Sequence, residues 1–310
     1  MQTEQPHLHT IEDLQTVQHV AIIPAYNESR FISRVVNKAR QHVDRVIVVD
    51  DGSTDRTMQE AQSAGATVLS LPNNIGKAAA VEAGLQFVAQ WQPECVVLLD
   101  GDDQHDAHEI PLLLAPIVAQ EADLVVGSRF AGIKSDIPKW RQVGQHTLTW
   151  LTNLGSGVRC SDSQSGFRAF SAEILPLLTF STSGFALESE MQFITRQHNL
   201  RLVEVPISVS YNGPSKRSPF IHALQVINSI VCLVGVGRPL FFWSTLSTIT
   251  LLGCFLAALQ VVTTYQQTAM LPIEYVLICA LLLIIGVSMI STGIILHSLR
   301  AWLVEKGRNA

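Results

Sequence analysis

Apolar runs alternate with helical patterns along the first half of the chain. The runs are short and rich in valine and isoleucine, as in strands buried on both faces of a sheet. They cover residues 20–24, 46–49, 67–69, 96–99 and 124–127. Segments with helical periodicity separate the runs and end near residues 42, 64 and 90. This alternation predicts a mostly parallel α/β sheet with helices on both faces.

The pattern is less regular in the second half of the chain. Residues 137–157 begin with basic side chains and continue as a helix, and a loop at 162–167 leads into a further strand. Another helical pattern covers about 185–198. The strand expected at 201–210 is interrupted by Pro206. Because proline cannot donate a hydrogen bond to a neighbouring strand, we place this strand at an edge of the sheet.

Two long apolar segments lie near the C-terminal end. Residues 240–262 and 275–296 carry no charged side chain, and each exceeds the roughly 20 residues that a helix needs to cross a bilayer. We therefore expect two transmembrane helices. Residues 219–233 form an apolar helical stripe preceded by Lys216 and Arg217, which favours a helix in the membrane interface. An ordinary core helix is the alternative for this stripe.

The placement of positive charge predicts the orientation of these helices. Their connection, residues 263–274, contains no lysine or arginine. Basic residues flank the other ends of the two apolar segments: Lys216, Arg217 and Arg238 before the first, and Arg300, Lys306 and Arg308 after the second. The positive-inside rule then places the large domain in the cytoplasm. Residues 1–17 are polar and lack the pattern of a signal peptide, which agrees with this placement.

Composition narrows the class of protein. Of the 310 residues, 47% are hydrophobic, which is high for a soluble enzyme, and the excess lies in the C-terminal segments. The net charge of −5 gives no basic surface that would indicate a nucleic-acid partner. The five cysteines are scattered and indicate neither a zinc site nor a disulfide framework. Gly-x-Gly-x-x-Gly and P-loop sequences are absent, which argues against dinucleotide dehydrogenases and ATPases.

The strongest candidate chemistry follows the apolar run at 96–99, which leads directly into Asp100-Gly101-Asp102-Asp103. Ligands of open α/β sheets gather at the carboxyl ends of strands. Gly101 allows a sharp turn, so Asp100 and Asp102 can face one point. Two carboxylates with room for water and phosphate oxygens suit Mg²⁺ or Mn²⁺. A solvated Asp-Gly turn is the alternative interpretation.

Several short motifs, taken in order, resemble those of inverting glycosyltransferases of family 2. They are Pro24-Ala25-Tyr26-Asn27-Glu28, Val49-Asp50-Asp51-Gly52-Ser53, Gly76-Lys77, Asp100-Gly101-Asp102-Asp103-Gln104-His105, Gly127-Ser128-Arg129-Phe130 and Gln164-Ser165-Gly166-Phe167-Arg168. Within that family the chain is most similar to the polyprenyl-phosphate glycosyltransferases, the dolichyl-phosphate mannose synthase group. The resemblance covers about residues 18–240 and extends in kind to the paired C-terminal helices.

The residue patterns and the resemblance together predict four parts of the chain. A polar tail at 1–17 precedes a catalytic domain of the GT-A type at 18–215, a nucleotide-sugar-binding domain with a mostly parallel sheet. An interfacial amphipathic helix follows at 216–239. Two transmembrane helices and a short cytoplasmic tail occupy 240–310. The protein is thus expected to be an integral membrane protein whose catalytic domain lies on the cytoplasmic face.

The resemblance also implies how a nucleotide-sugar donor is bound. The residues expected at the nucleotide and its phosphates are Pro24, Tyr26, Glu28, Asp51, Lys77 and Asp100. The residues expected to hold Mg²⁺ or Mn²⁺ on the donor diphosphate are Asp100, Asp102 and Gln104. Cleavage of the sugar–phosphate bond leaves charge on the diphosphate, and a divalent cation neutralises that charge as it forms. Glu28 and Lys77 have simpler alternatives as first-turn residues of helices.

The expected acceptor is polyprenyl phosphate at the surface of a lipid bilayer. A phosphate is already anionic at neutral pH, so it needs little help from a general base. It does need cationic side chains to hold it beside an anionic donor, and arginine suits that task. The resemblance gives this role to Arg129 and Arg141, which with Asp102 are the expected catalytic residues. The predicted reaction transfers a hexose, from a donor of the UDP-glucose or GDP-mannose type, with inversion at the anomeric carbon.

Two other functions stay open from the sequence. A glycosyltransferase acting on a hydroxyl group of a diacylglycerol-type lipid or a polysaccharide would need a carboxylate base, for which Asp103 and Glu188 are candidates. A membrane scaffold without catalytic activity is the alternative of another class, and the intact Asp100 and Asp102 argue against it. A homo-oligomer is compatible with the sequence but is not indicated by a specific pattern.

Overall fold

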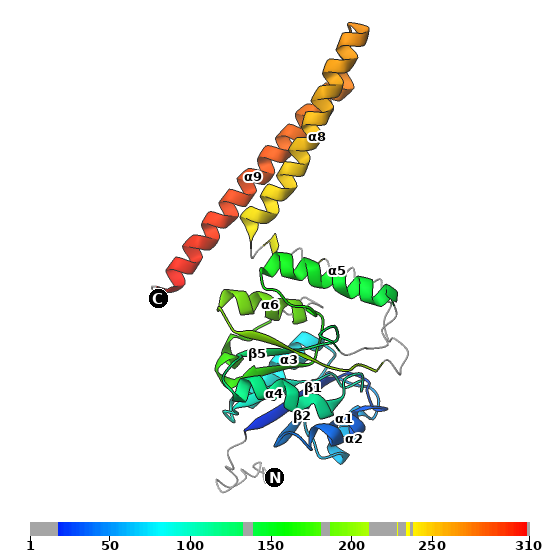
Figure 1. Cartoon of the computed structure of the whole chain (residues 1–310), viewed down its shortest axis with the longest axis vertical. Coiled ribbons are helices and arrows are strands. Elements are labelled where there is room, and N and C mark those ends of the chain that lie inside the picture. The colour runs from blue at the N-terminus through cyan, green and yellow to red at the C-terminus, as the bar shows by residue number, and fades with distance from the viewer. Residues whose placement is uncertain are drawn as a thin grey trace, which may run out of the picture. The chain divides into compact units, whose positions relative to one another are not determined.

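The computed structural model describes residues 18–132, 139–180, 187–210, 228, 234–235 and 238–308. The chain divides into two compact units, Met1–Ser229 and Ile230–Ala310 (Figure 1). The first unit contains a sheet flanked by helices, and the second contains two long helices. The tail expected at 1–17 and most of the interfacial helix expected at 216–239 lie outside the described residues.

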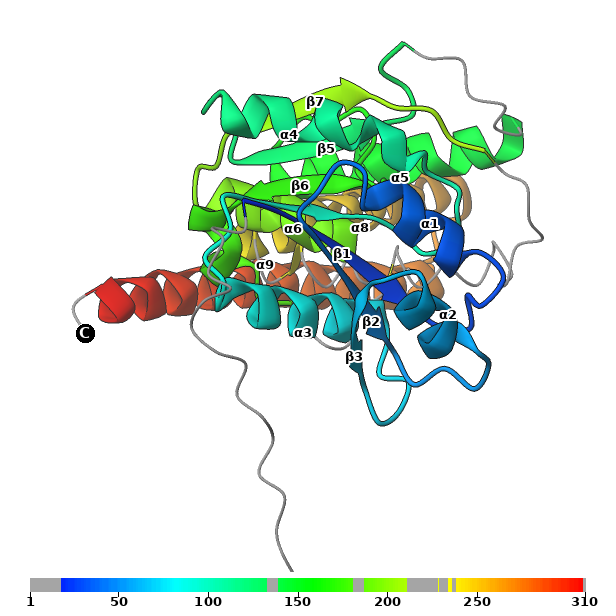
Figure 2. The same cartoon turned by 90° about the horizontal axis from the view of Figure 1, so that it is seen from below.

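The sheet has seven strands in the order β3-β2-β1-β4-β6-β5-β7, which Figure 2 shows from β7 at the top to β3 at the bottom. The strands are β1 (His19–Ala25), β2 (Arg45–Asp50), β3 (Thr67–Ser70), β4 (Cys95–Leu98), β5 (Leu124–Ser128), β6 (Arg168–Ser171) and β7 (Leu202–Pro206). Neighbouring strands are parallel except at β6, which pairs antiparallel with β4 and β5. The mostly parallel sheet is confirmed, and β7 lies at an edge as Pro206 predicts.

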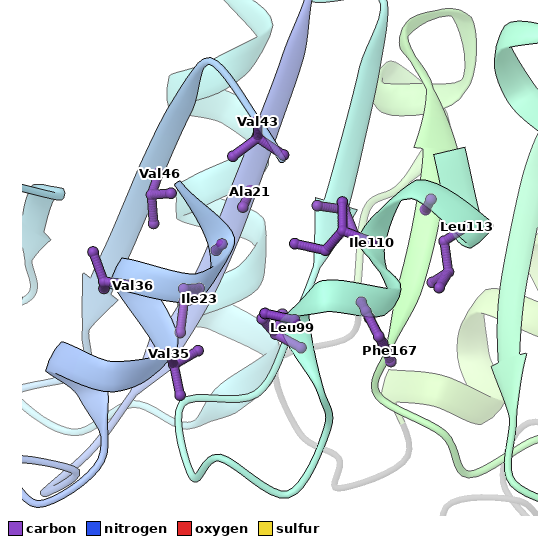
Figure 3. Close-up of a cluster of buried hydrophobic side chains, with 14 of the residues drawn as sticks. Ala21, Ile23, Val35, Val36, Val43, Val46, Leu99, Ile110, Leu113 and Phe167 are labelled. Carbon is purple, nitrogen blue, oxygen red and sulfur yellow. The ribbon is translucent and has the colours of Figure 1, made fainter. Parts of the chain in front are cut away.

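Helices cover both faces of the sheet. They are α1 (Ile32–Ala39), α2 (Thr57–Ser63), α3 (Lys77–Ala89), α4 (Ile110–Val118), α5 (Lys139–Ser156) and α6 (Leu187–Gln197), with 3-10 turns η2 (Ala107–Glu109) and η3 (Ala172–Leu177). Side chains alternate along β1, so Ala21 and Ile23 join the core under α1 and α4, which Figure 3 shows in close-up. Val20 and Ile22 join the core under α3, η3 and α6. The two buried faces explain why the strands read as continuous apolar runs.

Helix α4 is an element that the apolar pattern does not reveal. Its sequence is almost wholly apolar, so no helical period stands out, and it contains Pro111 and Pro116. Pro111 lies in the first turn, where its missing N–H costs nothing. The 3-10 turn η2 precedes the helix, and the Asp106 side chain caps that turn by accepting a hydrogen bond from the His108 N–H. Packing of Leu113 and Leu114 into the core outweighs the weak local propensity.

The second unit is a pair of long helices, α8 (Pro239–Thr268) and α9 (Ile273–Arg308). Both are long and apolar enough to span a membrane, and few of their residues are buried. A β-carbon on Gly286 would lie 2.8 Å from Leu251 Cδ2, and one on Gly293 would lie 2.9 Å from Trp243 Cβ. The Ser247 hydroxyl donates to the Gly286 carbonyl at 2.7 Å. The two glycines thus permit close packing of α8 against α9.

Candidate functional site

The loops at the carboxyl ends of the parallel strands are tied to one another. The Asp51 carboxylate follows β2, is buried, and accepts hydrogen bonds from the Ile75 and Gly76 N–H groups, each at 2.9 Å. The Ser53 hydroxyl accepts from the Asn27 N–H at 2.9 Å, which joins the loops after β1 and β2. Asp51 therefore fixes the turn that leads into α3, besides any contact it makes with a ligand.

Three further residues expected at the nucleotide lie at the end of β1 or in the loop after it. Pro24 is buried within that strand, whereas Tyr26 is exposed in the following loop. The Glu28 N–H donates to the Thr57 hydroxyl at 2.8 Å, and the Glu28 carbonyl accepts the first hydrogen bonds leading into α1. These residues share one edge of the sheet with Asp51, and their contact with a nucleotide stays a prediction.

Lys77 bridges two carboxylates from different elements. Its ammonium lies 2.7 Å from Asp100 Oδ1 at the end of β4 and 2.8 Å from Glu188 Oε1 in the first turn of α6. Burial opposes charge on Asp100, but the adjacent Lys77, with His105 and Arg129 farther away, holds the Asp100 pKa below its usual value. Burial likewise opposes charge on Glu188, and Lys77 lowers its pKa. The three side chains form an ionised cluster.

Asp102 is turned toward Gln104. Its Oδ1 accepts from the Gln104 N–H at 3.1 Å, and its Oδ2 accepts from Gln104 Nε2 at 2.6 Å. Burial raises the pKa of Asp102 to about 6, and the negative charge of Asp100 adds to that rise. Gln104 therefore orients Asp102 directly, an interaction that the proposed metal ligation of Gln104 did not anticipate.

The neighbouring Asp103 belongs to a separate cluster. Its backbone has a positive φ of 57°, and its carboxylate pairs with Arg34 at 2.9 Å and Lys38 at 3.2 Å, both on α1. Of the two candidate bases, Asp103 is thus bound to α1 and Glu188 is bound to Lys77. Lys77 holds the pKa of Glu188 below its usual value against the effect of burial, which makes Glu188 a weaker proton acceptor.

Arg129 follows β5 and is held by a carboxylate that the sequence did not single out. Its Nε and Nη2 donate to Asp162 Oδ2 and Oδ1, both at 2.6 Å, and its N–H donates to Oδ2 at 3.1 Å. Only 8% of the Arg129 side chain and none of the Asp162 side chain is exposed. The predicted acceptor cation is therefore half of a buried ion pair. The side chain of Arg141, on α5, lies outside the described residues.

The loop before β6 lies directly against Asp100. A β-carbon on Gly166 would lie 2.5 Å from Asp100 Oδ2 and 3.0 Å from Lys77 Nζ, so only glycine fits without displacement. The buried Arg168 holds the loop by donating to the Ser163 carbonyl at 2.8 Å and the Ser165 carbonyl at 2.9 Å. This packing gives a physical reason for the Gln164-Ser165-Gly166-Phe167-Arg168 motif.

The carboxylate pair fits a divalent cation. Asp100 and Asp102 are close enough for the charge of one to raise the pKa of the other, so a cation between them would relieve that repulsion. Carboxylate oxygens are the ligands that Mg²⁺ and Mn²⁺ prefer. Among the described residues no group of three or more histidine, cysteine, aspartate or glutamate side chains could hold a metal. Substrate phosphates and water would have to complete the coordination.

Comparison with known proteins shows which family the chain resembles. The sequence profile described as glycosyl transferase family 2 matches residues 20–175. A UDP-N-acetylglucosamine–dolichyl-phosphate N-acetylglucosaminyltransferase of Methanococcus voltae is 34% identical over 212 residues, covering 61% of this chain and 84% of that protein. An undecaprenyl-phosphate mannosyltransferase of Micrococcus luteus is 29% identical over 229 residues, covering 67% of this chain and 91% of that protein.

A solved structure shares the fold. Glucosyl-3-phosphoglycerate synthase of Mycobacterium tuberculosis, crystallised with Mn²⁺, uridine diphosphate and glucosyl-3-phosphoglycerate, superposes with a TM-score of 0.57 at 23% identity. The match covers 75% of this chain and 87% of that protein. The likeness shows a GT-A-like α/β fold. In this chain Asp100 and Asp102 follow the carboxyl end of β4.

Proposed function

Because the chain belongs to glycosyl transferase family 2, we propose that it transfers a hexose from a nucleoside-diphosphate sugar to polyprenyl phosphate, inverting the anomeric carbon. The observation that carries this proposal is the carboxylate pair Asp100 and Asp102 at a strand end of a chain that also has two helices apolar enough to span a membrane. Relatives named for transfer to dolichyl phosphate and undecaprenyl phosphate support the choice of acceptor.

The donor side of the proposal places the diphosphate over the end of β4. Asp100 and Asp102 would hold Mg²⁺ or Mn²⁺ there, and the cation supplies neutralisation of the charge that develops on the leaving diphosphate. Gln104 keeps the Asp102 carboxylate in position through its two hydrogen bonds. The nucleotide would lie along the loops after β1 and β2, beside Tyr26 and Asp51.

The choice of a phosphate as acceptor rests on the ion pairs made by the two candidate bases. A hydroxyl acceptor requires a carboxylate free to take its proton, but Asp103 is paired with Arg34 and Lys38, and Glu188 with Lys77. A phosphate acceptor needs no such base. Arg129 would then orient the phosphate by hydrogen bonding, because Asp162 fixes its guanidinium and offsets part of its charge. These pairings favour phosphate over hydroxyl.

An exposed apolar stripe agrees with an acceptor that arrives from a lipid surface. Val143, Trp150 and Leu154 lie on one face of α5 at helical spacing and are 66%, 62% and 45% exposed. The opposite face is buried, and its Thr149 hydroxyl accepts from the N–H of Ser163 at 3.2 Å. An apolar surface thus lies one helix away from the loop that contacts Asp100.

The proposal is tested by assaying the full chain in detergent against a panel of UDP- and GDP-sugars. Polyprenyl phosphate, the neutral polyprenol and diacylglycerol serve as parallel acceptors. We expect a product only with the phosphate, and only when Mg²⁺ or Mn²⁺ is present. Equal glycosylation of the polyprenol or of diacylglycerol would contradict the acceptor assignment, and a product formed in excess EDTA would contradict the metal.

Replacement of Gly166 by alanine is expected to lower transfer at least about tenfold, because the new methyl group must push the Asp100 carboxylate or Lys77 out of place. Gly144→Ala is the matched control, since a β-carbon there meets nothing within 4 Å and alanine is the better helix former. Initial rates and thermal unfolding of both variants provide the measurement. Wild-type turnover of Gly166→Ala would show that the loop does not constrain the carboxylate.

The orientation that we propose places the catalytic unit in the cytoplasm and the connection between α8 and α9 outside. In a background without the native cysteines, a Gln267→Cys variant should react with a membrane-impermeant thiol reagent in intact cells, because Gln267 is an exposed residue near the end of α8. An Asp44→Cys variant, exposed in the loop before β2, should react only after lysis. The reverse pattern would overturn the orientation.

A further inference from the structure

We propose that Lys77 is a resident counter-ion of the metal site, which neutralises Asp100 in the metal-free enzyme and moves off it, toward Glu188, when a divalent cation binds. This inference rests on the metal role of Asp100 and Asp102 in the proposed function. In addition, the metal ion replaces the Lys77 ammonium at Asp100. Glu188 then acts as a residue that positions Lys77 and not as a base.

Both carboxylate oxygens of Asp100 have close neighbours, and one of them already binds a cation. Its Oδ1 is 2.7 Å from Lys77 Nζ. Its Oδ2 faces the Gly166 backbone so closely that a β-carbon there would lie at 2.5 Å. A metal ion that bound Asp100 through Oδ1 would therefore have to share that oxygen with an ammonium. Two cations on one oxygen repel each other, even where the side chains are partly exposed, as Lys77 and Asp100 are.

Glu188 provides a place for the displaced ammonium. Its Oε1 already lies 2.8 Å from Lys77 Nζ, and its side chain is only 12% exposed. Lys77 is the first residue of α3 and Glu188 lies in the first turn of α6, so the two residues belong to separate helices. A rotation of the lysine side chain would break the ion pair with Asp100 and keep the ion pair with Glu188. The ammonium thus stays at the site instead of turning into solvent.

The balance of charge favours the exchange. Asp100, Asp102 and Glu188 carry three negative charges and Lys77 carries one positive charge, so the cluster has an excess that a divalent cation neutralises. Once Lys77 leaves Asp100, its ammonium lies beside the place where the donor diphosphate would bind the same cation. Metal binding would in this way free the Lys77 ammonium to donate hydrogen bonds to the diphosphate. Without the metal, Lys77 would stay paired with Asp100.

The test measures Mn²⁺ binding to the full chain in detergent, from the electron paramagnetic resonance signal of free Mn²⁺, with and without UDP. In Lys77→Met the competing ammonium is gone, so the Mn²⁺ Kd without UDP should fall roughly tenfold. UDP should then improve Mn²⁺ binding less than it does in the wild type. Lys38→Met is the matched control, since Lys38 also bridges two carboxylates, Asp103 and Asp106, and its Mn²⁺ Kd should stay within about twofold of wild type.

Glu188→Gln separates positioning from a direct electrostatic effect. With one anchor lost, Lys77 should bind Asp100 more firmly, so the Mn²⁺ Kd should rise. In the Lys77→Met background the same substitution should also be measured. The factor by which it raises the Mn²⁺ Kd should be at least about threefold smaller than in the wild-type background, because a positioning residue acts only through the lysine. Equal effects in both backgrounds would show that Glu188 acts on the metal without Lys77 and would overturn this part of the proposal.

An unchanged Mn²⁺ Kd in Lys77→Met without UDP would overturn the exchange, and so would a wild-type protein that binds no Mn²⁺. Lys77→Gln, which keeps a polar side chain, is measured in parallel, and thermal unfolding shows which variants are folded. Binding of Mn²⁺ needs no acceptor, so the result is independent of the acceptor assignment. A protein that passes this test but leaves polyprenyl phosphate unmodified would retain the exchange and lose only the proposed acceptor.

Discussion

An Asp102→Asn variant is expected to lose glycosyl transfer by a factor on the order of 10²–10³ while it keeps its fold. Asparagine has the shape of aspartate, and its side-chain oxygen can still accept one hydrogen bond from Gln104. It lacks the charge that, together with Asp100, would hold the divalent cation against the leaving diphosphate. The loss should therefore appear in kcat and in Mn²⁺ affinity, with little change in thermal unfolding.

Asp103→Asn is the matched control for this prediction. Asp103 is the adjacent carboxylate, but its partners are Arg34 and Lys38 on α1, and the Arg34 side chain is 64% exposed. The Asp103 side chain is only 12% exposed, so loss of its charge should cost about 1 kcal/mol or somewhat more in the free energy of unfolding. The folded variant should still transfer sugar at close to the wild-type rate. If the two variants lost activity equally, the loop as a whole would be responsible, and the metal role of Asp102 would fall.

The sequence predicts the parallel part of the sheet well, and the reason is burial. Strands covered on both faces must be apolar throughout, so β1, β2 and β4 are visible as runs of valine, isoleucine and leucine. Strand order is different, because pairing depends on contacts between distant residues. The insertion of β6 between β4 and β5, antiparallel to both, leaves no signal in the local pattern of any of the three strands.

The candidate site divides in the same way. Asp100 and Asp102 could be placed at a strand end because a strand and a glycine turn specify their position locally. The partners of these carboxylates could not be predicted in this way. Lys77 comes from the start of α3 and Glu188 from α6, and the two residues are 111 positions apart in the sequence. The sequence gives each of these side chains a charge, but only the packing of α3 and α6 on one face of the sheet decides which charges meet.

Arg129 shows most clearly that the sequence does not reveal which distant side chains pair. It follows β5 directly, and its charge helps to lower the pKa of Asp100. The buried Asp162 that binds it lies 33 residues away in a loop whose residues read as ordinary turn formers. Glu204 on β7 in turn accepts hydrogen bonds from the Ser161 N–H at 2.8 Å and the Asp162 N–H at 3.3 Å. The predicted phosphate ligand is thus also a structural residue.

This double role makes Arg129→Ala the most damaging single substitution we expect. Without the guanidinium, the buried Asp162 carboxylate loses its ion pair, and loss of one member of a buried pair costs about 3–5 kcal/mol in the free energy of unfolding. Transfer should be lost as well, but that loss alone would not show whether Arg129 contacts the acceptor or only holds the loop. A second substitution is needed to separate the two effects.

The Arg129→Ala/Asp162→Ala variant provides that separation, because removing the stranded charge should restore much of the lost stability, measured by thermal unfolding in detergent. Transfer should stay low if Arg129 orients the acceptor phosphate, and donor binding, measured by calorimetry, should be close to wild type. Arg129→Lys should be partly active with a raised KM for polyprenyl phosphate, since lysine keeps the charge but cannot pair with Asp162 through two nitrogens. Wild-type transfer by the double variant would show that Arg129 only stabilises the loop, and the acceptor phosphate would then need another ligand.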